Sequence, residues 1–376
     1  MKKLFYLIIG ATLVASCAKT VQEVTVNDEI TFQVARHKSL TKATSDYKDE
    51  YASVPFGAYA WFKGENSADD TEFMINQEVS YNTTGNLWAP TGTTYYWPKT
   101  GSLDFICYSP YATPGSTDAP FPTVTENGIS YPAWDVNAHP GVDVMYADKV
   151  TGQKNNSNQY YYNGVPTLFH HALAKVSFII KPSYLSYTAD TGDTTSWEII
   201  VNDITVNNLL TTGSFDITLD AGGDWVVPDV WTPDPSSPTT DLPLDLSSLG
   251  GLPLDGSEQD LTTDLFVLPQ TLDQGQEVIL NVTINTYRDN NDGLGPQLVL
   301  TETDVDITAL LSGGSLDSWD VNQNITYTFN ITPSLATPGD DVDGDGIPDS
   351  YEPTVVYFDP AVDDWQNVDV NAGIVI

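Results

Sequence analysis

Helix-breaking residues are spread through the whole chain. Its 376 residues include 27 glycines and 24 prolines, about one breaker in every seven positions. Such a density leaves little room for long helices, whereas the 20 tyrosines, 13 phenylalanines and 9 tryptophans favour strands. Between the breakers, apolar and polar residues alternate over short stretches, as they do in half-buried strands. The sequence therefore predicts an all-β fold.

The expected strands are numerous enough for two domains. They fall at residues 30–34, 56–62, 95–97, 103–108, 142–147, 176–180, 197–206, 213–219, 264–268, 277–286, 297–307 and 325–331. Strands at this spacing predict two antiparallel β-sandwich domains, 17–164 and 165–376. The sequence also predicts a hairpin at 95–108, irregular chain at 109–141, a helical turn at 170–175 and an inserted loop at 232–260. Within that insertion, Leu-Pro-Leu-Asp occurs twice, at 242–245 and 252–255.

Residues 1–16 have the pattern of an export signal. Lys2 and Lys3 precede an apolar run at 4–15, which is too short to span a bilayer and suits a signal peptide. The small residues before Cys17 resemble a bacterial lipobox, in which Cys17 becomes the first mature residue and carries lipid such as palmitate. An ordinary signal peptide with an incidental cysteine is the alternative. We expect an outer membrane lipoprotein at the cell surface.

The charge of the chain argues against several classes of function. The 51 acidic residues outnumber the 14 lysines and arginines, and the formal net charge is −37. Nucleic acids and anionic lipid surfaces are bound through basic patches, so neither is an expected partner. The sequence also lacks G-x-S-x-G, H-E-x-x-H and phosphate-loop motifs. We therefore expect no enzymatic activity.

The remaining cysteine and the histidines do not predict a metal site. Cys107 lies in a strand-like run, where a thiol is usually buried and inert. His170 and His171 are adjacent, so on a strand they face opposite sides. His37 and His139 are distant in sequence, whereas zinc needs converging ligands. We expect no zinc site.

An acidic loop at 339–352 contains the sharpest local motif. It fits the calcium-loop pattern D-x-D-x-D-G-x5-E, in which alternate carboxylates and one main-chain carbonyl converge on the cation. Prolines at 338, 348 and 353 exclude the helices of an EF-hand. The loop is typical of a Ca²⁺-binding linker, and a metal-free acidic turn is the alternative. The expected ligands are Asp341, Asp343, Asp345, Ile347, Asp349 and Glu352.

Several segments, in this order, resemble the fimbrillin superfamily, the type V pilus subunits of Bacteroides-group bacteria. The first is the lipobox. The second is Thr-Lys-Ala-Thr at 41–44, followed by the strand-like residues 56–60. The others are Tyr-Tyr-Trp-Pro at 95–98 with the following run at 103–111, the segment 142–147, and Phe-His-His-Ala-Leu-Ala-Lys-Val at 169–176. The last is the most specific. The insertion at 232–260 and the acidic loop depart from the family pattern. The resemblance implies two transthyretin-like sandwich domains and assembly by strand exchange outside the outer membrane.

The N-terminal strand has the features of a removable segment. Arg36 follows the alternating residues 30–34 and precedes a polar, basic stretch. A trypsin-like protease cutting there would remove residues 17–36 and leave an apolar groove. Lys38 and Lys42 are rival cleavage sites, and an ordinary surface loop is the alternative.

The C-terminus has the features of a donor strand. Val368, Val370, Ala372, Ile374 and Ile376 occupy every second position. One apolar face of this kind can fill a groove while main-chain hydrogen bonds pair with its edges. The alternative is the last strand of the chain's own domain.

Together these features predict a structural or adhesive subunit of a cell-surface fimbria. Its partners would be other fimbrial subunits, with host or bacterial surface glycans or proteins as further candidates. The alternative function is a permanently anchored surface lipoprotein that binds glycans. Apart from Ca²⁺, no cofactor is expected.

Overall fold

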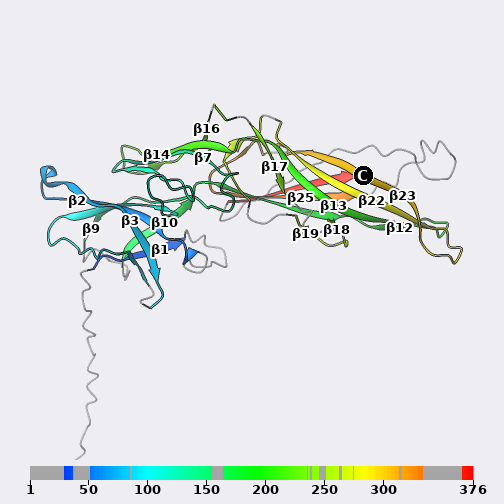
Figure 1. Cartoon of the computed structure of the whole chain (residues 1–376), viewed down its shortest axis with the longest axis horizontal. Helices are drawn as coiled ribbons and strands as arrows, with labels where there is room; N and C mark the ends of the chain where they lie inside the picture. The colour runs from blue at the N-terminus through cyan, green and yellow to red at the C-terminus, as the bar shows by residue number, and fades with distance from the viewer. Residues whose placement is uncertain are drawn as a thin grey trace, which may run out of the picture.

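The computed structural model describes an elongated, almost entirely β protein (Figure 1). It covers residues 29–36, 51–84, 87–154, 164–234, 236–237, 239–244, 251–261, 265–273, 275–312, 316–332 and 366–375, without the side chains of 33–36, 243–244, 332 and 366–375. A short 3₁₀ turn, η1 (Ser67–Asp69), lies among the strands. No helix in this part of the chain is long and apolar enough to cross a bilayer. The all-β prediction is confirmed.

The first sheet closes on itself. Its strands are β1 (Phe32–Arg36), β2 (Phe56–Lys63), β3 (Thr71–Asn82), β4 (Leu87–Pro90), β5 (Ser102–Ser109), β8 (Met145–Ala147), β9 (Val150–Gln153) and β10 (Val165–His171). They pair in the order β2-β3-β4-β1-β10-β8-β5, with β9 on β5, and β5 also pairs with β2. A buried cluster draws residues from strands all around this ring, including Phe32, Phe56, Phe105, Val165 and Phe169.

A second sheet packs against the first. It contains β6 (Thr123–Thr125), β7 (Gly128–Asp135), β14 (Thr212–Leu219), β15 (Trp225–Val226) and β16 (Thr232–Pro233). Tyr59 and Trp61 of β2 join Tyr131 of β7 and Phe215 of β14 in the core between the sheets. The neighbouring residues Ala58 and Ala60 belong to the other cluster. Both faces of β2 are therefore buried, which explains its continuous apolar run.

The second pair of sheets forms the other half of the molecule. One contains β11 (Ala174–Pro182), β19 (Gln259–Asp260), β20 (Leu265–Val267), β25 (Gln323–Thr332) and β26 (Gln366–Val375). The other contains β12 (Ser186–Thr188), β13 (Thr194–Leu209), β17 (Thr240–Leu244), β18 (Leu252–Pro253), β22 (Glu277–Asp289) and β23 (Gln297–Leu310). β21 (Gln270–Thr271) and β24 (Ser318–Trp319) form a separate pair. A large apolar core includes residues from both main sheets.

Among the described strands, three pairs are parallel and the others antiparallel. The parallel pairs are β1 with β10, β11 with β25, and β25 with β26. The chain also crosses between the two halves more than once. β10 begins at the expected division near residue 165 yet belongs to the first sheet. β14, much later in the sequence, returns to pair with β7. The two halves are thus interleaved along the sequence.

Several local expectations were wrong. Residues 109–141 are not wholly irregular, because Ile129 and Tyr131 of β7 face a core that stabilises a strand. The hairpin at 95–108 does not form, since both edges of β5 are occupied, by β2 on one side and by β8 and β9 on the other. Tyr96 makes only an isolated bridge, to Glu29.

The inserted segment is more than a loop. Its two Leu-Pro-Leu repeats supply β17 and β18, and both strands pair with β13. Leu242 lies opposite Val206, and Leu252 lies opposite Val201. Proline is tolerated in such edge strands because its missing N–H can face away from the partner. The repeat therefore reflects two short edge strands laid along one long strand.

Candidate functional site

The predicted removable segment occupies an inner position of the first sheet. β1 runs parallel to β10, with Phe32 opposite Val165 and Arg36 opposite Phe169. Its other side meets β4 at Trp88. Just before β1, the N–H of Ile30 donates to the Tyr95 carbonyl at 2.8 Å. Removing β1 would therefore open a gap between two strands that both remain in the sheet.

This strand contributes directly to the core. Phe32 is 1% exposed, and its ring meets the rings of Phe56 and Phe105 edge-on at centroid distances of 5.5 and 5.8 Å. Ile30 is almost as deeply buried. Loss of these two side chains would expose aromatic surface along the gap. A replacement strand would have to supply comparable apolar groups.

The structure places Arg36 at the end of β1, rather than in the loop beyond it. Its backbone pairs with Phe169 in the sheet. Lys38 and Lys42 lie outside the described residues. A protease acting after Arg36 would need the last part of β1 to separate from β10, because cleavage requires an extended and accessible backbone.

The predicted donor segment forms β26 in the same chain. All ten of its residues pair in parallel with β25. Figure 1 draws the segment as the red strand near the C-terminal mark. Val368, Val370, Ala372 and Ile374 lie opposite Ile325, Tyr327, Phe329 and Ile331, all of which are fully buried. The apolar positions of the segment thus match the core positions of its neighbour. Ile376 lies outside the described residues.

A buried polar group lies where the two halves meet. The Asp143 carboxylate accepts hydrogen bonds from the Tyr51 hydroxyl at 2.6 Å and from Nδ1 of His171 at 2.8 Å. Asp143 and His171 are both more than nine-tenths buried. Tyr51 precedes β2, while His171 ends β10. The contact therefore ties the entry of β2 to the end of β10.

The chain bends at residues 172–173 of this joint and forms no helix there, so the expected helical turn was wrong. β10 ends at His171, β11 begins at Ala174, and the two residues between them are fully buried. The Ala172 N–H donates to the Val144 carbonyl, and the Ala172 carbonyl accepts from Nε1 of Trp231 at 2.6 Å. The most specific sequence motif therefore forms the passage between the two halves.

The histidines lie in separate environments. His170 contacts Asp148 and stacks on Tyr146, on the opposite side of β10 from His171. The ring of His139 stacks on that of Trp134, with the ring centroids 3.9 Å apart. In the described part of the chain, no group of three or more metal-ligating side chains comes together. Cys107 is buried, and burial raises the pKa of its thiol.

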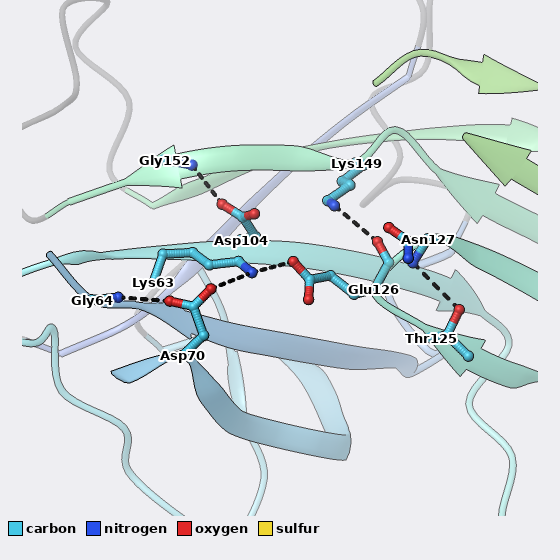
Figure 2. Close-up of polar contacts among 9 residues, drawn as sticks. All are labelled: Lys63, Gly64, Asp70, Asp104, Thr125, Glu126, Asn127, Lys149 and Gly152. Carbon is cyan, nitrogen blue, oxygen red and sulfur yellow. Dashed lines mark hydrogen bonds and ion pairs between the residues drawn. The ribbon is translucent and has the colours of Figure 1, made fainter. Parts of the chain in front are cut away.

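Two lysines link the first sheet to the turn between β6 and β7. Figure 2 shows the Lys63 ammonium between the carboxylates of Asp70 and Glu126. Lys149 donates to the Glu126 carbonyl at 2.8 Å. The hydrogen bond to Glu126 raises the pKa of Lys63, and the bond from Lys63 lowers the pKa of Asp70. These contacts join the two sheets and do not form a catalytic arrangement.

Two predicted sites fall outside the described residues. They are Cys17 and the calcium loop with Asp341, Asp343, Asp345, Ile347, Asp349 and Glu352. Lipidation and calcium binding therefore stay predictions. Sequence reasoning also missed β3 and β4, although β4 forms one wall beside β1. The only local signal for β4 was the apolar run at 87–89, which is too short to identify a strand.

Comparison with known proteins decides the family. The fimbrillin-like family model matches residues 24–343. The chain belongs to the fimbrillin-like family. Fimbrillins are fimbrial subunits, so the family indicates a fimbrial protein of the cell surface. No curated protein matches the chain.

Several solved structures are similar to this fimbrillin-like protein. A Bacteroides uniformis protein provisionally assigned to cell adhesion is 17% identical, with 81% of this chain and 93% of that chain covered and a TM-score of 0.43. A Bacteroides eggerthii protein with the same assignment is 12% identical, with 93% of this chain and 97% of that chain covered and a TM-score of 0.40. A Bacteroides ovatus fimbrial protein is 11% identical, with 73% of this chain and 46% of that chain covered and a TM-score of 0.26.

Proposed function

We propose that this chain is exported as a lipoprotein through Cys17 and becomes a polymerising fimbrial subunit after cleavage near Arg36. Loss of residues 17–36 opens the position of β1 between β4 and β10. The C-terminal strand of another copy then fills it. Palmitate or a similar acyl chain on Cys17 holds the precursor at the outer membrane until cleavage releases it.

One observation carries this proposal: a strand close to the N-terminus supplies buried core residues. Ile30 and Phe32 lie inside the first sheet, yet a polar, basic stretch follows them in the sequence. Cutting that stretch would release a core element without breaking the rest of the sheet. The alternating apolar positions of residues 368–376 supply the type of strand that such a gap requires.

The alternative is a permanently anchored lipoprotein that captures glycans. Glycan binding often uses an exposed aromatic platform, because sugar rings stack on aromatic faces. Among the described residues, the exposed large aromatic side chains are Tyr96 and Tyr187. Tyr96 bridges to Glu29 beside the first sheet, whereas Tyr187 lies on β12 in the other half. This arrangement favours the fimbrial function.

Replacing all three basic residues should block processing. We expect Arg36→Ala, Lys38→Ala and Lys42→Ala together to abolish polymers after treatment with a trypsin-like protease, while the thermal midpoint stays that of the wild type. Mass spectrometry of the N-terminus measures processing directly. Replacement of Lys99 and Lys181, basic residues far along the chain, is the matched control. Normal polymers from the triple variant would contradict the cleavage step.

Calcium should order the acidic loop. Its carboxylates repel one another without a cation. We therefore expect Ca²⁺ at about 1 mM to slow proteolysis within residues 339–352 by about tenfold, as the dissociation constants of extracellular Ca²⁺ modules, about 0.1 mM and above, imply. Chelation should reverse the protection. Replacing both Asp343 and Asp345 by asparagine should remove the protection, whereas replacing Asp289 and Asp292 by asparagine should leave it unchanged. Absence of calorimetric binding at millimolar Ca²⁺ would make the segment an acidic turn.

A further inference from the structure

The long strand β23 has an unusual free edge. It pairs with β22 on one side, and no described strand pairs with its other side. Three of its apolar residues are well exposed, Leu298 at 54%, Val299 at 40% and Leu310 at 53%. A long edge strand with exposed apolar residues is a ready template for pairing with another chain.

Two bulges interrupt this edge. Between the pairs Ile284–Glu302 and Val282–Val305, β23 has one more residue than β22. Asp304 lies in that bulge with φ +57°, a conformation that aspartate tolerates better than most residues. A second irregularity leaves Val299 as an extra residue between Leu298 and Leu300. Bulges twist an edge strand and break the straight run of main-chain groups that a new strand would need.

Acidic residues occupy the centre of the same edge. Glu302 lies opposite the buried Ile284, so it shares the inward face of the sheet. Burial raises the pKa of its carboxyl. Asp304 is exposed beside it, and Asp306 accepts a hydrogen bond from Asn281 on β22. An inward-pointing charge on an edge strand is a recognised obstacle to further pairing.

The positions of these residues oppose pairing with a second copy of this chain. In an antiparallel pair centred on Asp304, Leu298 of one copy would lie opposite Leu310 of the other. That register would join the exposed apolar ends. It would also set Asp304 against its counterpart and gather Glu302 and Asp306 of both copies on either side of that pair. Like charges placed directly opposite one another destabilise a sheet.

We infer that β23 carries a structural guard, formed by the bulge at Asp304 and the acids Glu302, Asp304 and Asp306, which prevents lateral edge-to-edge pairing of two copies. The guard acts in the free subunit and does not depend on strand exchange. In an assembled fimbria it would direct association to the ends of the subunit.

An isosteric variant tests the charges. Glu302→Gln, Asp304→Asn and Asp306→Asn preserve shape, and asparagine also tolerates the positive φ. We expect the full-length variant to self-associate about tenfold more strongly than the wild type in sedimentation experiments, because six carboxylate charges, three from each copy, are removed from the seam. Hydrogen exchange should slow within residues 297–310. A second variant, which also lacks Thr303, removes the extra residue of the bulge and should associate more strongly still.

The control removes the same number of charges elsewhere. Glu65→Gln, Asp118→Asn and Asp190→Asn replace exposed acids outside β22, β23 and the turn between them, and should keep the wild-type behaviour. The inference is overturned if the isosteric variant stays monomeric with a wild-type melting profile, if the control associates equally, or if exchange slows outside 297–310. Polymerisation after protease treatment is scored separately, so failure of strand exchange would leave this result intact.

Discussion

Removal of residues 366–376 is expected to abolish polymers while leaving a folded, soluble subunit. In the proposed strand exchange this segment is the donor, so the truncated chain would have none to place in a neighbour. β25 would become an edge strand, yet it would keep its eight paired residues with β11. Its buried residues would also remain part of the large apolar core. Protease-treated samples should therefore show monomers by electron microscopy and sedimentation.

The truncated chain also separates the two roles of β26. If the segment is mainly the last strand of its own domain, its loss should remove ten paired residues of native sheet and lower the thermal midpoint sharply. A midpoint well below that of the wild type would refute the donor assignment. Asp369→Asn with Asn371→Ser is the control, because it changes the alternate positions and leaves the apolar ones intact. That variant should polymerise normally.

Replacing Trp231 by alanine should cost about 4 kcal/mol of unfolding free energy, as large buried aromatic truncations do. The side chain is 2% exposed and stacks on Phe215 with ring centroids 5.2 Å apart. Its Nε1 also donates to the Ala172 carbonyl in the joint between the two halves. The substitution removes the packing and leaves that buried carbonyl without its donor. Urea unfolding followed by fluorescence measures the loss.

Trp231→Phe isolates the hydrogen bond. It keeps a ring in the stack and removes the donor, so its cost should be about 1 kcal/mol. Tyr187→Ala removes an exposed aromatic ring and should have little effect, since the side chain is 44% exposed. A loss below about 1 kcal/mol for the alanine variant would show that the surrounding aromatic residues repack around the cavity.

Alternation identified most long strands because a buried face imposes a period of two on the sequence. β10, β11, β13, β14 and β22 show this alternation clearly in their burial. β3 did not stand out, since its buried residues Met74 and Val79 are separated by a bulge at Asn76. Local sequence patterns also did not indicate which strands pair with one another. The return of β14 to β7 depends on contacts between residues far apart in sequence.

The site was predictable to a similar degree. Apolar alternation at the two ends of the chain identified β1 and β26 as unusual strands. Nothing local indicated that β1 lies between β4 and β10, because β10 is more than a hundred residues further along. The hydrogen bonds of Asp143 to Tyr51 and His171 were likewise hidden. Each residue lies in ordinary sequence, and only the fold brings them together.

The return of β14 to the first half has a mechanical consequence. The backbone passes between the halves along β10 and β11, and again before and after the strands at 212–233. Two bodies joined by several crossings resist bending far better than two bodies on a single tether. A fibre built from such units would take up curvature where one molecule meets the next. Its stiffness would then be set by those contacts, and each unit would act as a rigid rod.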